Sequence, residues 1–383
     1  MSLRQSKWFC PEPFSNIFIT TDGAAAPCCV SGHWPLKEHQ THNIKDWSKV
    51  QNSKYFKGLR EDLSKGAGDF ISNYCSWCYK NEEAGRKSHR QNYVERLTDE
   101  EWDLLDKAYL DKNNYKPPII KSMQIKALAG NYCNLSCQMC LASESSGLAL
   151  ENRKLGIEDN HPLDRPAKYL FPWDQNGLEE YLRKTQILKL VGGETLAIKA
   201  NYDILKTCID KKISDNISVE IITNATIFPK FDNYDIFDYI PFFKNFNITC
   251  SVEIWGEEND YIRYPSKWKE TEKNIYRLNE TNANVAVAST VNALNIGYLN
   301  KMKFPRYSFM SVVSADNPFS ITSIPPDIRQ NLNILPEHKE LLNVFKYDKN
   351  NMDKMLEVIR KRDQFRGTKL TDELEPYRKK YNL

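Results

Sequence analysis

Short runs of β-branched and apolar residues alternate with longer segments of helical periodicity through the middle of the chain. The short runs predict strands at 122–128, 187–191, 218–223, 247–253, 284–292 and 307–313. The longer segments predict helices at 178–184, 202–212, 234–243, 267–281 and 295–302. This alternation is typical of a parallel sheet with right-handed crossovers. We therefore expect an α/β fold, with an open or closed β/α barrel over residues 119–315.

Alternation within two of the strands predicts which side chains face the barrel interior. In the strand at 247–253, apolar residues occupy every second position, so Thr249, Ser251 and Glu253 are expected to face inward. In the strand at 284–292, the same pattern turns the valines outward and leaves these residues inside: Ala286, Ala288, Thr290 and Asn292. Polar side chains inside a barrel are hard to explain as packing, so they are candidates for ligand binding.

Three further segments flank the predicted barrel. Residues 1–95 are dense in cysteine, aromatic and turn-forming residues and predict a small domain around a metal site. Residues 96–118 predict a helical linker, with a helix at 97–112 capped by Thr98 and ended by a double proline. Residues 316–383 predict a C-terminal extension with an amphipathic helix at 351–363, whose apolar positions dock on the core.

Composition and charge limit the function classes. The 383 residues are 41% hydrophobic and 27% charged, with a net charge of +3 and basic and acidic residues interspersed. This pattern favours a globular protein and gives no sign of a nucleic-acid groove or a membrane-binding face. The sequence contains neither a signal-peptide apolar region nor a run of ~18–20 apolar residues. We expect a soluble, cytoplasmic protein, whose ten cysteines are metal ligands, catalytic groups or core residues.

A cysteine triplet follows the first predicted barrel strand. Cys133, Cys137 and Cys140 lie within Tyr-Cys-Asn-Leu-Ser-Cys-Gln-Met-Cys. Three thiolates so close together suit three corners of a cubane iron–sulfur cluster and leave one iron without a protein ligand. The polar neighbours disfavour three buried structural cysteines, and a zinc site would require a fourth ligand.

The spacing Cys-x3-Cys-x2-Cys after a first strand resembles the signature of the radical S-adenosylmethionine (radical SAM) superfamily. Over residues 119–315 the resemblance implies a partial (β/α)6 barrel of TIM-like type, with a [4Fe-4S] cluster on the triplet. In that family the unligated iron binds S-adenosylmethionine. One electron cleaves this cofactor to methionine and a 5'-deoxyadenosyl radical, which abstracts hydrogen from the substrate. A flavodoxin or ferredoxin is the implied reductant.

The resemblance also implies cofactor contacts. Gly192, Gly193 and Glu194 resemble the Gly-Gly-Glu motif that contacts the methionine amino group, with Thr195 where a proline is usual. Asn224 falls near the ribose, and Ser251 and Arg263 fall where related enzymes hold the cofactor carboxylate. For Arg263 a surface salt bridge is the alternative. Asn292 joins the cofactor-binding candidates as an inward-facing residue. The catalytic acid, base or hydrogen donor is unknown.

The small domain contains a second set of cysteines. Cys10, then Thr21-Asp22-Gly23 and Pro27-Cys28-Cys29, then Cys75-Ser-Trp-Cys78, resemble the SPASM and twitch domains that bind auxiliary iron–sulfur clusters, although here they precede the barrel. Four ligands, Cys10, Cys28, Cys75 and Cys78, would saturate one further [4Fe-4S] cluster, with Cys29 as the alternative to Cys28. Zinc is the alternative metal. Cys208 and Cys250 fall on apolar faces, so one auxiliary cluster and two clusters in total are expected.

Together these features predict a radical SAM enzyme with an N-terminal twitch-like domain. A peptide or protein is the expected substrate, and the dehydrogenation of a small-molecule alcohol is the alternative. A hypothesis of a different class is a non-catalytic, zinc-binding adaptor. No nucleic-acid or membrane partner is predicted.

Overall fold

The computed structural model describes residues 2–19, 25–31, 50–66, 68–83, 87–126, 131–157 and 175–370. These residues form one eight-stranded sheet with the order β2-β1-β3-β4-β5-β6-β7-β8. The strands are β1 (Asn16–Ile19), β2 (Ala25–Ala26), β3 (Ile120–Lys126), β4 (Thr185–Val191), β5 (Ser218–Thr223), β6 (Asn245–Ser251), β7 (Asn284–Val291) and β8 (Tyr307–Val312). Neighbouring strands run parallel, except for the antiparallel pair β1 and β2.

The α/β class and the six predicted strands are confirmed as β3–β8. Each observed strand begins or ends within two residues of its predicted limits, and the predicted end of the first strand, Leu128, lies outside the described residues. Consecutive strands in the chain are also neighbours in the sheet. All the carboxyl ends of β3–β8 therefore lie along one edge, where parallel α/β sheets bind ligands.

The sheet continues into the N-terminal segment, which the sequence did not predict. Strand β1 pairs in parallel with β3, so that Asn16 lies opposite Ser122 and Ile19 opposite Ile125. The Asn16 Oδ1 atom also accepts a 3.0 Å hydrogen bond from the Ser122 main-chain N–H. All four β1 residues are buried, as in a strand covered on both faces. The predicted small domain thus shares the sheet with the predicted barrel.

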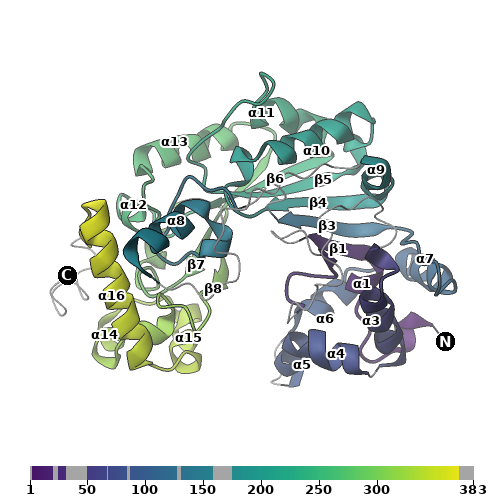
Figure 1. Cartoon of the computed structure of the whole chain (residues 1–383), viewed down its shortest axis with the longest axis horizontal. Coiled ribbons are helices and arrows are strands. Elements are labelled where there is room, and N and C mark those ends of the chain that lie inside the picture. The colour runs from purple at the N-terminus through teal and green to yellow at the C-terminus, as the bar shows by residue number, and fades with distance from the viewer. Residues whose placement is uncertain are drawn as a thin grey trace.

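Helices cover the outer face of the sheet and flank its two ends (Figure 1). In the N-terminal part they are α1 (Glu12–Ser15), α3 (Lys54–Lys65), α4 (Asp69–Tyr74), α5 (Ser76–Glu83), α6 (His89–Val94), α7 (Asp99–Tyr109) and α8 (Ser146–Leu155). The central helices are α9 (Gln175–Lys184), α10 (Lys199–Asp210), α11 (Ile236–Tyr239), α12 (Glu258–Ile262) and α13 (Trp268–Asn279). The C-terminal helices are α14 (Pro326–Asn331), α15 (Lys339–Val344) and α16 (Lys349–Arg366). Helices α9, α10, α11 and α13 lie on the outer face of the sheet, whereas α3–α6 and α14–α16 lie at its two ends.

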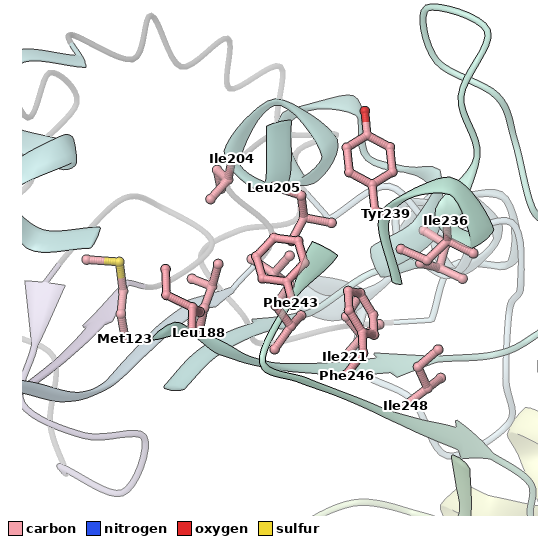
Figure 2. Close-up of a cluster of buried hydrophobic side chains, with 14 of the residues drawn as sticks. Met123, Leu188, Ile204, Leu205, Ile221, Ile236, Tyr239, Phe243, Phe246 and Ile248 are labelled. Atoms are coloured by element: carbon pink, nitrogen blue, oxygen red, sulfur yellow. The ribbon is translucent and has the colours of Figure 1, made fainter. Parts of the chain in front are cut away.

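The main core lies between the sheet and its outer helices. Leu188, Ile221 and Ile248 point from successive strands toward Leu205 and Phe243 (Figure 2). Cys208 and Cys250 are fully buried in this core, which confirms their predicted apolar setting. Burial of these side chains fixes the register of the strands, because a slip of one residue would turn the apolar set to the other face.

Strand alternation holds for β6 and only in part for β7. Phe246, Ile248 and Cys250 are buried, while Thr249 and Ser251 are partly exposed on the opposite face. In β7 the register shifts between Ser289 and Thr290. The three valines of β7 are all buried, Val291 in a second core with C-terminal residues. Ala286 and Thr290 are partly exposed, whereas Ala288 and Ser289 are both buried and interrupt the alternation.

Two predicted helices differ in the structure. The segment 295–302 is a turn followed by a short 3-10 helix, Leu299–Lys301, because the Asn295 side chain accepts from the Asn292 N–H and competes with helical bonding. The segment 234–243 divides into α11 and the 3-10 helix Ile240–Phe242, where Pro241 stands. Further 3-10 helices are Leu3–Gln5, Ala142–Glu144, Thr195–Ala197, Ser214–Asn216, Ile321–Ser323 and Pro336–His338.

The flanking helices follow the sequence closely. Helix α7 begins after Thr98, whose side chain forms a capping box with Glu101 as N3 residue. Helix α16 buries the predicted apolar positions Met352, Met355, Leu356 and Ile359 in the second core. Across the described residues, no helix has both the length and the apolar character needed to cross a lipid bilayer.

Candidate functional site

The cysteine triplet lies on a loop that follows β3 and is fixed to a distant segment by main-chain hydrogen bonds. The Ser136 N–H donates to the Tyr264 carbonyl and the Gln138 N–H to the Ile262 carbonyl, both at 2.7 Å. These bonds hold the main chain of the two residues on either side of Cys137. They also bring Arg263, between the two acceptor residues, to the triplet loop (residues 131–141).

The three thiols share an environment that disfavours the ionised form when nothing is bound. Cys137 is 7% exposed, and Cys133 and Cys140 are partly buried. Burial, together with the neighbouring Cys137, raises the pKa of Cys133 to about 12. Burial also raises the pKa of Cys137, although Arg263, Arg366 and Arg362 oppose it. A positively charged iron–sulfur core would offset the cost of ionising these buried thiols, because cysteine binds the core as a thiolate.

The donor set fits a cluster bound by three cysteines. Within the described residues, no three histidine, cysteine or carboxylate side chains converge on a position for a single metal ion. In a cubane each cysteine binds a different iron atom, so its ligands surround the cluster instead of a single ion. Three thiols on one short loop are consistent with that arrangement.

The Gly-Gly-Glu turn after β4 packs directly on the triplet loop. Gly192 and Gly193 have positive φ angles of 93° and 56°. A Cβ atom on Gly193 would lie 2.3 Å from the Tyr132 carbonyl oxygen, so only glycine fits there. The Glu194 N–H donates a 2.7 Å hydrogen bond to the same oxygen. The structure therefore joins two motifs that are far apart in the sequence.

The Glu194 carboxylate is fully buried. It accepts hydrogen bonds from the Thr223 hydroxyl at 2.6 Å, from the Asn224 N–H at 2.7 Å and from the Leu196 N–H at 3.0 Å. Burial raises its pKa, and these three donors oppose that shift. Glu194 has no ion-pair partner among the described residues. A carboxylate held in this way is suited to a cation supplied by a ligand.

Asn224 connects the end of β5 to the triplet loop. Its Nδ2 atom donates to Asn134 Oδ1 at 2.9 Å, and Asn134 Nδ2 donates to Thr226 Oγ1 at 2.8 Å. Together with the Glu194 contact, this places three of the predicted motifs around one loop. The carboxyl ends of β3, β4 and β5 thus form one polar surface.

Arg263 forms a buried ion pair with Glu253, at 3.0 Å between Nη1 and Oε1. The two side chains are only 11% and 1% exposed, so the alternative of a surface salt bridge is wrong. Glu253 also accepts from the Thr290 N–H at 3.0 Å and from Asn295 Nδ2 at 3.1 Å. Burial raises the pKa of Glu253 to about 7 against the opposing effect of Arg263. The alternation of the strand at 247–253 predicted that Glu253 faces inward, but the sequence did not mark Glu253 as a cofactor-binding residue.

The last two predicted cofactor residues have different surroundings. Ser251 is the partly exposed last residue of β6. Asn292 is fully buried; its Oδ1 accepts from the Leu294 N–H at 2.9 Å and its Nδ2 donates to the Thr290 carbonyl at 2.8 Å. The Asn292 amide therefore stabilises the turn after β7, whereas Ser251 remains accessible to a ligand.

Helix α16 contributes two residues that the sequence analysis missed. Arg362 and Arg366 donate to the main-chain carbonyls of Gln138 and Ser136, at 2.7 and 2.6 Å. Their four-residue spacing places them on one helix face, which was visible in the sequence. The triplet loop that they contact could not be identified from the sequence as their partner, because it lies more than two hundred residues earlier in the chain.

The N-terminal cysteines also lie near one another. Cys10 and Cys78 are buried, and Cys28 and Cys75 are partly buried, whereas Cys29 is exposed. Burial raises the pKa of Cys10, and the nearby Glu12, Cys28 and Cys75 add to the shift. Burial and then Cys78 raise the pKa of Cys75 to about 12. Thr21-Asp22-Gly23 lies outside the described residues.

A cavity lies between the N-terminal segment and the face of the sheet opposite the outer helices. Gln124, Lys189 and Glu220 line it from β3, β4 and β5 at one level of the sheet. Lys189 and Glu220 form an ion pair of 2.8 Å and are each about one-third exposed. Cys28 and Arg96 line the opposite wall. The cavity therefore combines polar strand residues with one of the N-terminal cysteines.

Comparisons with known proteins give distant structural similarities. One is to native anSMEcpe with bound AdoMet: 15% identity, a TM-score of 0.38, and coverage of 65% of this chain and 68% of that chain. Another is to Streptococcus suis SuiB bound to S-adenosylmethionine: 17% identity, a TM-score of 0.39, and coverage of 82% of this chain and 63% of that chain. A third is to TYW1 with a lysine-pyruvate adduct bound: 11% identity, a TM-score of 0.30, and coverage of 61% and 70%.

In the comparison with S-adenosylmethionine-bound SuiB, the chain spans less than two thirds of that chain, and a second SuiB structure is covered to 70%. No family model matches the sequence, and neither does any curated protein.

Proposed function

We propose that this protein is a radical SAM enzyme, with a [4Fe-4S] cluster on Cys133, Cys137 and Cys140. The observation that carries the proposal is the position of Glu194. Its buried carboxylate has hydrogen-bond donors but no ion-pair partner in the described part of the chain, and its turn is bonded to the residue before Cys133. An adaptor that binds zinc has no need for such a carboxylate beside a loop with three cysteines.

The chain's own residues would bind and orient the cofactor. Glu194 would accept hydrogen bonds from the ammonium group of S-adenosylmethionine, beside the close approach allowed by Gly192 and Gly193. Arg263 would bind the carboxylate with the guanidinium nitrogens that do not face Glu253, and Ser251 would donate its hydroxyl. Asn224 would act near the ribose. When bound, the cluster and S-adenosylmethionine supply a 5'-deoxyadenosyl radical for hydrogen abstraction.

We further propose an auxiliary [4Fe-4S] cluster on Cys10, Cys28, Cys75 and Cys78. The burial of Cys10 and Cys78 and the mutual proximity of Cys10, Cys28 and Cys75 support this choice. Cys28 is preferred to Cys29 because Cys29 is exposed. Such a cluster would accept an electron from a substrate radical or deliver electrons to the first cluster.

The cavity beside Cys28 is our candidate for the substrate site. It is lined by inward-facing polar residues of the sheet on one side and by the N-terminal segment on the other. A peptide or protein side chain is the proposed substrate. Hydrogen transfer between a deuterated candidate peptide and 5'-deoxyadenosine would identify it, and transfer from a small alcohol instead would favour the dehydrogenase alternative.

Anaerobic purification and cofactor cleavage test the proposal. The wild-type protein should be brown, with about eight irons per chain if both cubanes form. After reduction it should release 5'-deoxyadenosine from S-adenosylmethionine, and Cys137→Ala should abolish this release because one cluster corner is lost. A colourless protein with zinc and no acid-labile sulfide would contradict the proposal. Cleavage retained in Cys137→Ala would place the site elsewhere.

A further inference from the structure

We propose that helix α16 completes the first cluster site: Arg362 and Arg366 position the triplet loop and supply a buried positive charge that balances the bound cluster. This inference rests on the proposed function. Figure 1 shows α16 beside α8, at the opposite end of the molecule from helices α3–α6. The two helices enclose the triplet loop through charged and polar side chains.

Arg366 binds the loop on the N-terminal side of Cys137. Its Nη2 atom donates to the Ser136 carbonyl at 2.6 Å and to Glu151 Oε1 of α8 at 2.7 Å, while Nε donates to Glu151 Oε2 at 3.0 Å. The guanidinium also lies over the Tyr264 ring at 4.6 Å. Its side chain is fully buried. This bidentate geometry is available to arginine and not to lysine.

Arg362 binds the loop on the C-terminal side of Cys137. Its Nη1 atom donates to the Gln138 carbonyl at 2.7 Å and to Gln138 Oε1 at 3.0 Å, and Nη2 donates to Asn152 Oδ1 at 3.2 Å. The Ser136 and Gln138 N–H groups already bind the 262–264 segment. The two residues that flank Cys137 are therefore each held at both their main-chain N–H and their main-chain carbonyl. The carbonyl contacts come entirely from α16.

The two arginines of α16 have fewer direct ion-pair partners than positive charges. Arg362 and Arg366 share one carboxylate, Glu151, at 3.4 and 2.7 Å. Arg263 has its own partner in Glu253. Counted by direct ion pairs among the described residues, the two arginines of α16 thus have one carboxylate for two positive charges, with Asp363 as a more distant negative charge near Arg366. Burying an incompletely paired charge is costly.

A bound cluster would supply the missing negative charge. An oxidised [4Fe-4S] core carries two positive charges, so with three thiolates it has one net negative charge. This charge is opposite in sign to the incompletely paired charge of the two arginines. Because net charge near a cluster sets its reduction potential, removal of one arginine should make the cluster harder to reduce.

Two buried hydrogen-bond donors beside the triplet loop are unpaired among the described residues. Arg366 Nη1 and Gln138 Nε2 are buried and have no hydrogen-bond partner among the residues that the structure describes. Buried donors are normally paired, so their presence beside the triplet indicates that a further acceptor belongs there. Cluster sulfurs accept hydrogen bonds and fit this need.

The test compares full-length wild-type protein with Arg366→Gln and Arg362→Gln, which remove one charge each. Lys361→Gln is the matched control: it removes the same charge from the same helix, but its partner is the exposed Glu357 at 2.8 Å. Two properties are measured. The first is hydrogen exchange of the 131–141 segment in the metal-free proteins. The second is the midpoint potential of the cluster whose paramagnetic signal changes when S-adenosylmethionine is added.

We expect faster exchange in both arginine variants and a lower midpoint potential in whichever retains the cluster. Lys361→Gln should match the wild type in both properties. Arg366→Lys should recover much of the potential but not the exchange protection, since lysine cannot make the bidentate contact. Arginine variants that match the wild type in exchange and potential would overturn the inference while leaving the proposed enzyme intact. A wild-type protein without a cluster would instead refute the proposed function itself.

Discussion

The Glu194 main-chain N–H donates a 2.7 Å hydrogen bond to the Tyr132 carbonyl oxygen, one residue before Cys133. The turn after β4 and the loop after β3 are therefore joined by a main-chain contact. A change at this contact should affect the cysteine triplet and the Glu194 carboxylate together.

Gly193→Ala should disturb this contact. Its Cβ would lie 2.3 Å from the Tyr132 oxygen, and the residue has a φ of 56°. We expect a loss of stability of about 1–3 kcal/mol from strain, with a further loss from the clash. Thermal unfolding and S-adenosylmethionine binding measure the two effects. Gly156→Ala is the control, because Gly156 has a φ of 60° but open space around it. If both variants bind the cofactor equally well, the contact has no role in binding.

Glu194→Gln should weaken S-adenosylmethionine binding by roughly 10- to 100-fold, because a charge-assisted hydrogen bond contributes about 1.5–3 kcal/mol. Burial raises the pKa of Glu194. The carboxylate therefore protonates at a higher pH than an ordinary glutamate, and binding should weaken as pH falls through that raised pKa. Calorimetric titration at several pH values measures both effects. Glu180→Gln, at an exposed i,i+4 pair, should bind like the wild type. A pH-independent affinity in the wild type would argue against an ionised Glu194 in binding.

Cys75→Ala should remove the auxiliary cluster and leave the first one. Iron content should fall from about eight to about four per chain, while reductive cleavage of S-adenosylmethionine without substrate should continue. Cys208→Ala, at a core cysteine, should keep all the iron and lose only stability, by about 1 kcal/mol. If cleavage stops in Cys75→Ala but not in Cys208→Ala, the second cluster is required for delivering electrons to the first.

Lys189→Ala should impair substrate turnover more than cofactor chemistry. Lys189 lines the candidate substrate cavity and pairs with Glu220, away from the triplet loop. We expect at least a tenfold loss in product formation once a substrate is known, with substrate-free release of 5'-deoxyadenosine unchanged. Lys206→Ala, at an exposed pair on α10, controls for loss of a surface charge. An equal loss of product formation and of substrate-free 5'-deoxyadenosine release would mean that Lys189 stabilises the fold and does not bind the substrate.

Local sequence patterns determined much of this protein. Strands β3–β8 followed from apolar alternation, and the start of α7 followed from Thr98, because periodicity and capping act within a few residues. The triplet and the Gly-Gly-Glu turn were recognisable for the same reason: their chemistry lies in short, contiguous spacings. Ser251 was placed inward by the two-residue period of β6 alone.

Only the tertiary structure decided which of these local features meet. Nothing near Asn16 predicts its pairing opposite Ser122, and nothing near Arg366 predicts its contact with the Ser136 carbonyl. The same holds for Arg263 and Glu253, which became a buried pair because the 262–264 segment bonds to the triplet loop. Such contacts depend on how distant segments close over one another. The free energy that selects them comes from burial and from satisfying polar groups across the whole fold, which no local pattern contains.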